Sequence, residues 1–199
     1  MNLSELLSGP LGQSVINNVS SQLGMNKAEA SSAVGVAVPA ILAGLTKNSQ
    51  SAQGAESLNK ALESKHDGSL LDNLSSMFQN QPSAVQQDGN GILEHIFGKN
   101  KLAVEKGVAQ KSGLSLEKVR PLLAMLAPIV MAYVGKQKRQ TNTASGGLGD
   151  LLGGLLGGGG ASAKKTSGGG LLDAVAGMLG GGQKKGGSIV DDILGGLLK

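Results

Sequence analysis

Apolar residues recur every three or four positions along most of the first 140 residues, which is the spacing of one helix face. The pattern is densest in two stretches, "LGMNKAEASSAVGVAVPAILAGL" (23–45) and "SLEKVRPLLAMLAPIVMAYVG" (115–135). No segment alternates apolar and polar residues with a period of two, so strands are not expected. The hydrophobic pattern therefore predicts an all-α, multi-helical bundle.

The two dense stretches belong to a longer internal repeat. Sliding the chain by 89 positions aligns residues 3–47 with 92–136 without a gap and gives eight identities in 45 positions. We interpret the body, residues 1–140, as two duplicated helical-hairpin units of about 1–47 and 92–136, joined by a helical connector over 48–91. Two homologous units of this kind would pack as one pseudo-twofold bundle.

Each copy divides into a short amphipathic turn, a second helix and a longer third helix. Glycines close the first two pieces, where a left-handed C-cap residue is favoured: Gly9 and Gly24 in one copy, Gly98 and Gly113 in the other. The third helix starts after a capping residue, Asn26 or Ser115. Glu29 stands three positions after Asn26, which predicts a reciprocal capping box.

Pro39 and Pro128 occupy the same place in the third helix of each copy, in the middle of its apolar run. A proline inside a helix removes one hydrogen bond and presses on the preceding turn. We therefore predict a kink at Pro39 and at Pro128 that wraps each helix over a compact core. The carbonyls left without a donor would be those of Gly35 and Ala124, two small residues that let a neighbouring group approach.

The connector has two parts. Residues 54–78 have the pattern of two helices separated at "HDG". Residues 79–91, "QNQPSAVQQDGNG", are rich in polar residues and contain proline and glycine, which predicts a loop.

After residue 140 the composition changes to a Gly/Leu-rich, low-complexity tail, with 20 of the 33 glycines in the last 59 residues. Three amphipathic cassettes follow one rule (Asp, any, apolar, small, Gly, Leu or Met, Leu): "DLLGGLL" (150–156), "DAVAGML" (173–179) and "DILGGLL" (192–198). The tentative interaction residues are the leading aspartates and the closing apolar pairs: Asp150, Leu155, Leu156, Asp173, Met178, Leu179, Asp192, Leu197 and Leu198.

Such cassettes are too short and too glycine-rich to be stable helices in water, and Gly/Ser/Lys linkers separate them. We therefore expect residues 141–199 to be flexible when free and to fold only against a partner surface. That surface is the bundle of the same chain, the bundle of a second copy or a membrane surface. The remaining alternative is a tail without a fixed partner.

Composition excludes several kinds of function. The chain has no cysteine, which removes disulfides and thiolate sites and suits a reducing compartment. Aromatic residues are 2% of the chain, too few to form stacking platforms for single-stranded nucleic acid. The first residues lack a signal-peptide pattern, and no run reaches the roughly 18 apolar residues of a spanning helix. We expect a cytoplasmic protein.

The net charge of +4 is modest, and one basic group stands out: Lys136, Lys138 and Arg139. A solvated helix end that complements the helix dipole accounts for this group. A patch that contacts phosphates is the alternative.

No pattern of catalytic, cofactor-binding or metal-binding residues emerges. His66 and His95 are the two histidines, and Glu94 lies beside His95. Neighbouring residues in a helix point apart, so we expect both histidines to be structural, at the surface or half-buried. A pocket that held His95 with two carboxylates would favour an enzyme instead. The sequence predicts no enzyme activity, no cofactor and no small-molecule substrate.

The segment "GILEHIFGKNKLAVEKGVAQKSGLSLEKVRPLLAMLAPIVMAYVGK" (91–136) resembles the bacterial family called domain of unknown function 937, related to YidB-like proteins. The motifs that carry the resemblance are G-x-x-I/L-L-x-x-I/L-F-G, then S-G-L-S, then L-A-P-I-V. It covers about residues 1–140. The resemblance implies an all-α fold and brings no catalytic residues.

A second part, "VAQKSGLSLEKVRPLLAML", is similar to the helical hairpin of histone-like HU proteins, which bend DNA. Those proteins also need basic β-arms for the minor groove, and this sequence has none. We therefore expect a non-enzymatic structural or protein-interaction protein whose cassettes mediate self-association. The alternative is a nucleoid- or DNA-associated helical protein. The partners expected are a second copy or another protein, with nucleic acid and membrane disfavoured.

Overall fold

The computed structural model describes residues 7–144 and 147–157. Every regular element in these ranges is helical, which confirms the all-α prediction. In chain order the elements are α2 (Pro10–Leu23), α3 (Lys27–Ser49), α4 (Ala52–Ser64), α5 (Ser69–Asp72), α6 (Leu74–Asn80), α7 (Pro82–Phe97), the 3-10 turn η1 (Gly98–Asn100), α8 (Lys101–Ser112), α9 (Leu116–Thr141) and α10 (Leu148–Gly157).

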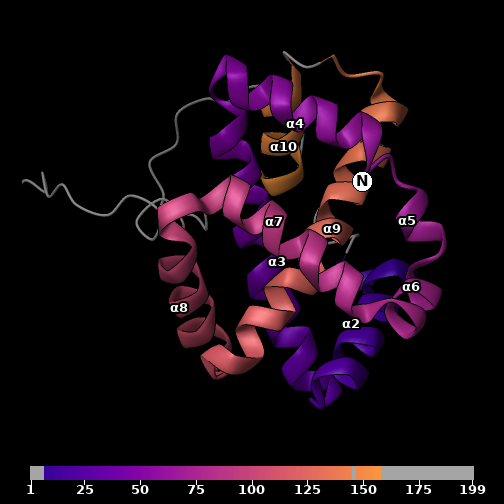
Figure 1. Cartoon of the computed structure of the whole chain (residues 1–199), viewed down its shortest axis with the longest axis vertical. Helices are drawn as coiled ribbons and strands as arrows, with labels where there is room; N and C mark the ends of the chain where they lie inside the picture. The colour runs from indigo at the N-terminus through magenta and orange to yellow at the C-terminus, as the bar shows by residue number, and fades with distance from the viewer. Residues whose placement is uncertain (1–6, 145–146, 158–199) are drawn as a thin grey trace, which may run out of the picture.

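The long helices α3 and α9 form the centre of the bundle (Figure 1). They contact each other, and each also contacts both shorter helices, α2 and α8. The connector helices α4, α5 and α7 and the last helix α10 also pack on α3 or α9, and α6 packs on α7, α2 and α5. The core between them is almost entirely aliphatic, and its aromatic members are Phe78, Phe97 and Tyr133. The polar surface therefore surrounds one continuous apolar cluster.

The shift of 89 positions that aligns the sequence also aligns the helices. It carries α2 onto α8 and the first residue of α3, Lys27, onto the first residue of α9, Leu116. The glycines that end α2 and α8 are both left-handed, with φ and ψ of 59° and 41° at Gly24 and of 74° and 10° at Gly113. The two copies therefore share their order of elements, and their origin in a duplication stays a prediction.

The N-terminal cap of the third helix agrees with the sequence in the first copy only. The Asn26 side chain accepts a hydrogen bond from the Glu29 backbone N–H at 2.8 Å, and the Asn26 N–H donates to Glu29 Oε2 at 3.1 Å, which confirms the capping box. Ser115 makes no side-chain cap. The prediction for Gly9 is wrong, because Gly9 is extended (φ −76°) and stands before Pro10, the first residue of α2.

Each proline lies inside a continuous helix: Pro39 in α3 and Pro128 in α9. Neither helix is interrupted there, and the kink itself stays a prediction. In the second copy a neighbour approaches the carbonyl that the proline frees, because a Cβ on Gly89 would stand only 1.7 Å from the Ala124 oxygen. In the first copy the position of Gly35 is exposed, and nothing lies near it.

The predicted loop over residues 79–91 is wrong, since most of this segment belongs to α7. The buried residues of α7 recur every four positions: Val85, Gly89, Leu93 and Phe97. This stripe was hidden in the sequence because one of its members is a glycine among polar residues. Gly89 is required there because α7 packs with its backbone directly against α9.

By length and hydropathy, α3 and α9 would each be able to cross a membrane. However, 67% of the most apolar window of α3 and 83% of that of α9 are buried inside the bundle. Burial of this extent is typical of the central helices of a bundle, so hydropathy alone is weak evidence for a membrane segment.

Candidate functional site

The first cassette of the tail forms part of α10, which packs mainly against α3 and also contacts α4 and α9. Figure 1 shows α10 beside α4 at the end of the bundle where α3 finishes. Three leucines at helical spacing point into the core and are 0%, 0% and 5% exposed: Leu148, Leu152 and Leu155. We call the surface that receives them the α10 groove. The first cassette therefore lies on the bundle of its own chain, which is one of the surfaces that the sequence analysis considered.

The other tentative residues of this cassette lie at the edge of the contact. Asp150 is exposed in the first turn of α10, where a carboxylate complements the helix dipole. Leu156 is half-buried. The tentative residues of the later cassettes lie outside the described residues: Asp173, Met178, Leu179, Asp192, Leu197 and Leu198.

The glycines inside α10 are not required by packing. A Cβ on Gly153 or on Gly154 would meet nothing within 4 Å. Each glycine therefore weakens the helix by about 1 kcal/mol relative to alanine without allowing a closer approach. Helix α10 is therefore less stable than the same helix would be with alanine at both positions, and this lower stability favours reversible docking.

The three buried positions of α10 are apolar in every cassette. Relative to the leading aspartate they are two before it, two after it and five after it. These positions hold Leu148, Leu152 and Leu155 in the first cassette, Leu171, Val175 and Met178 in the second, and Val190, Leu194 and Leu197 in the third. The position before the aspartate was missed from the sequence, because the cassette rule started at Asp. All three cassettes therefore share the apolar pattern by which α10 contacts the groove.

The matching end of α9 is covered by the connector. Lys138 is 8% exposed, and its Nζ lies 2.6 Å from Glu63 Oε1 at the end of α4. Arg139 NH1 lies 3.2 Å from Asp67 Oδ2 in the turn that follows α4. The expected solvated helix end is thus wrong for Lys138, which is buried and paired. Two of the three cations of the basic group are held by carboxylates, which weakens the case for phosphate binding.

These contacts also lower the pKa values of the two acidic residues. The hydrogen bond and the charge of Lys138 lower the pKa of Glu63. Hydrogen bonds from the Ser69 hydroxyl and backbone N–H, with a smaller effect of Arg139, lower the pKa of Asp67. Both carboxylates are therefore charged in the folded bundle at neutral pH.

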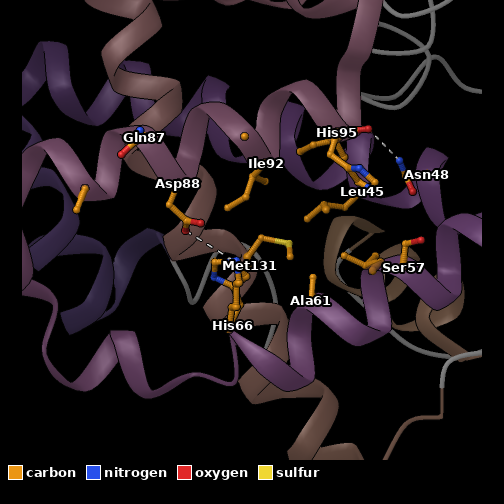
Figure 2. A pocket seen from close by; sticks show the side chains of 15 residues that line it. Leu45, Asn48, Ser57, Ala61, His66, Gln87, Asp88, Ile92, His95 and Met131 are labelled. Carbon is orange, nitrogen blue, oxygen red and sulfur yellow. Dashed lines mark hydrogen bonds and ion pairs between the residues drawn. The ribbon is translucent and has the colours of Figure 1, made fainter.

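A cavity of about 570 Å³ opens between α4 and α7, with α3 and α9 beneath it. Its walls are mostly aliphatic: Leu45, Leu58, Ala61, Ile92, Ile96 and Met131. Figure 2 shows Asp88 and His66 turned toward each other at one end, and His95 with Asn48 at the other. There Asn48 Nδ2 donates to the backbone carbonyl of His95 at 3.3 Å. We call this space the α4–α7 cavity.

His66 is 4% exposed, so it is buried rather than at the surface or half-buried as predicted. Its Nε2 lies 3.7 Å from Asp88 Oδ2, and its Nδ1 has no hydrogen-bond partner among the residues that the structure describes. Burial lowers the pKa of His66 and outweighs the opposite effect of Asp88, with Lys65 lowering it further. The imidazole is therefore neutral at neutral pH, and Asp88 faces it without a full positive charge.

The cavity lacks the arrangement that would have favoured an enzyme. His95 lines it with a single carboxylate, that of Asp88, where two were required. Within residues 7–144 and 147–157, no three His, Asp or Glu side chains come close enough to hold a metal ion. The cavity was missed from the sequence because its polar residues come from α3, α4, α7 and the turn after α4. In addition, residues 79–91 were expected to form a loop.

A family model described as "Bacterial protein of unknown function (DUF937)" matches residues 5–137. The match confirms the resemblance seen in the sequence and covers the bundle up to the end of α9. No curated protein matches the chain, and no solved structure matches it.

Proposed function

The chain belongs to the DUF937 family of bacterial proteins, whose description assigns no function, and from its geometry we propose a self-associating protein-interaction module without catalytic activity. In this proposal the α10 groove is the binding site and the Leu-Gly cassettes are its ligands. The first cassette fills the groove of its own chain. The second and third, residues 173–179 and 192–198, bind the same groove on neighbouring chains.

The observation that carries the proposal is the match between the groove and all three cassettes. The structure identifies three buried positions in α10, and each is apolar in the two later cassettes. One body thus offers one such groove, while one chain carries three segments that fit it. Such an excess of ligands over sites in the same chain favours binding between chains.

Association of this kind is expected to be weak and to rise with concentration. The first cassette follows α9 after a short connection, so its effective concentration at the groove is about millimolar. A cassette from another chain has to displace it. The unneeded glycines of α10, Gly153 and Gly154, lower the free energy that holds the first cassette in place.

The test locks α10 in its own groove. A Cβ on Gly149 would lie 3.7 Å from the Ser49 hydroxyl oxygen, a separation that a disulfide can span, and the chain has no cysteine to interfere. Oxidised Ser49→Cys/Gly149→Cys should stay monomeric by light scattering up to about 1 mM, in the range of the effective concentration. The reduced form should gain mass with concentration as the unmodified chain does.

The single variant Ser49→Cys, oxidised in the same way, is the control for effects of the substitution itself. Equal association of the locked and reduced forms would contradict a role for the α10 groove. A full chain that remains monomeric at every concentration would contradict self-association altogether.

The absence of cysteine also supports a place in the cytoplasm, and we keep that location as part of the proposal. The DNA-associated alternative is less well supported. Two of the cations at the end of α9, Lys138 and Arg139, are paired with acidic residues, and the net charge is +4. Retention of the full chain by duplex DNA at near-physiological salt would revive it.

A further inference from the structure

No residue of α10 lines the α4–α7 cavity, and the proposed function makes no use of this cavity. At about 570 Å³ it is within the size range of small-molecule sites, which are mostly apolar with a few polar groups. Its aliphatic walls come from four helices, so the space is held open by the bundle and not by one loop. A chain of eight or so carbon atoms, taken at about the 30 Å³ that one water molecule occupies for each carbon, would fill less than half of this space.

The polar end of the cavity is defined by Asp88. Its carboxylate is half-buried, with 41% of the side chain exposed. Among the described residues, the Asp88 carboxylate faces the His66 imidazole, and His66 Nε2 lies 3.7 Å from Asp88 Oδ2. That distance is longer than a hydrogen bond. Because burial keeps His66 neutral at neutral pH, the imidazole does not compensate the carboxylate charge. A half-buried carboxylate beside apolar walls attracts a cation.

Lys65 also lines the cavity, but it is exposed and forms no ion pair with Asp88. A long lysine side chain at the surface keeps its ammonium in water, where the charge is screened. Asp88 is therefore the charged group with the stronger influence on a ligand inside the cavity.

We propose that the α4–α7 cavity binds a small amphipathic amine, with its aliphatic body between Ile92 and Met131 and its ammonium group on the carboxylate of Asp88. The ammonium donates to the Asp88 oxygens. The aliphatic body covers apolar surface that the bundle leaves open at Ile92 and Ile96, both half-buried. His66 holds the floor of the polar end and contributes no charge.

The experiment uses the full chain and three probes of equal length: n-octylamine, 1-octanol and n-octanoate. Binding is followed by the chemical shifts of isotope-labelled methyl groups of Ile92 and Met131. We expect octylamine to bind at least about tenfold more tightly than octanol, which corresponds to about 1.4 kcal/mol for one charged hydrogen-bonded contact. Octanoate should bind no better than octanol.

The matched variants are Asp88→Asn and Glu94→Gln, both on α7. Glu94 is exposed and does not line the cavity, so Glu94→Gln should leave all three affinities unchanged. Asp88→Asn should weaken octylamine about tenfold and leave octanol unchanged. The unchanged octanol affinity shows that the cavity of the variant is intact.

Three results would overturn the proposal. They are an octylamine affinity that Asp88→Asn leaves unchanged, tighter binding of octanoate than of octylamine, and no binding of any probe. A peptide of residues 189–199, which also combines apolar residues with a lysine, provides a further arm. If it displaces octylamine from the cavity at lower concentrations than octylamine requires, the cavity belongs to the tail and not to a small amine. The results with the three small probes do not bear on the locked α10 variant.

Discussion

Helices α3 and α9 occupy equivalent places in the two copies, yet they are covered in different ways. The connector covers the end of α9 and is fastened by the ion pairs Lys138–Glu63 and Arg139–Asp67. Helix α10 covers the end of α3 with three leucines and two glycines that packing does not need. The most apolar window of α9 is 83% buried, against 67% for α3.

The two covering segments, the connector on α9 and helix α10 on α3, differ in how easily they can leave the bundle. The connector is joined to the bundle at both of its ends, so it cannot leave α9 without opening the whole fold. Helix α10 follows the last helix of the bundle and is joined to it at one end. Its release is therefore a local opening with a smaller free energy than global unfolding. In the proposed function, the first copy therefore provides the exchangeable surface, and the second copy provides the stable one.

The largest effect is expected where α7 meets α9. Gly89→Ala places a methyl group within 1.7 Å of the Ala124 oxygen, a backbone atom that has no room to move. We expect a loss of about 3 kcal/mol or more in the free energy of unfolding, measured with urea. Gly91→Ala on the same helix meets nothing within 4 Å and should be neutral or stabilising by up to about 1 kcal/mol. Equal effects of the two variants would refute the close packing of α7 on α9.

The next largest effect is expected from a comparison of two buried leucines, one in the connector and one in α10. Leu62 in α4 is 1% exposed and Leu152 in α10 is 0% exposed. Leu62→Ala should lower the free energy of global unfolding by about 2–5 kcal/mol, because α4 is part of the cooperative fold. Leu152→Ala should instead remove the hydrogen-exchange protection of α10 and leave that of α9 intact. Loss of protection throughout the bundle in Leu152→Ala would show that α10 is not an independent cover.

A smaller effect in the opposite direction is expected from Gly153→Ala/Gly154→Ala. Each substitution should stabilise α10 by about 1 kcal/mol, because neither new methyl group meets another atom. The docked state becomes more populated, so hydrogen exchange in α10 slows and self-association decreases. Stronger self-association of this variant would mean that a more helical first cassette binds neighbouring chains in preference to the groove of its own chain, contrary to the proposal.

The smallest effect is expected in the dependence of stability on acidic pH. The pKa values of Glu63 and Asp67 are lowered in the folded state, so their contribution to stability is present at neutral pH and is lost as the pH falls through those lowered values. The Glu63 side chain is 60% exposed and that of Asp67 is 38% exposed, so solvent screens both ion pairs and the contribution is small. We expect the loss of stability between pH 6 and pH 3 to be smaller in Glu63→Gln/Asp67→Asn. An unchanged pH profile would show that these ion pairs do not fasten the connector.

Much of the fold could be predicted because helix spacing, caps and repeats are local signals. The apolar runs of α3 and α9 and the cap of Asn26 and Glu29 required no knowledge of their neighbours. The first half of α7 could not be predicted, because a buried Gly89 has meaning only beside the Ala124 carbonyl. The same holds for the buried Lys138, whose partner stands 75 positions away in the sequence.

The candidate sites show the same limit. The cassettes repeat within the sequence and were found there, but the buried position at Leu148 became visible only when α10 was seen on α3. The α4–α7 cavity joins Asp88 of α7 to His66, which follows α4 in a separate part of the chain. No spacing rule connects these two residues.

The central claim, that the groove on α3 receives cassettes from other chains, can be tested by mixing two single-cysteine chains. One carries Ser49→Cys beside the groove. The other carries Leu172→Cys, the position of the second cassette that corresponds to Gly149 in the first. Under mild oxidation we predict a disulfide between the two chains, and excess unmodified chain should suppress it. A control chain with Lys99→Cys in η1, outside the three helices that α10 mainly contacts, should not form this disulfide. Equal cross-linking of Leu172→Cys to both partners would contradict the claim.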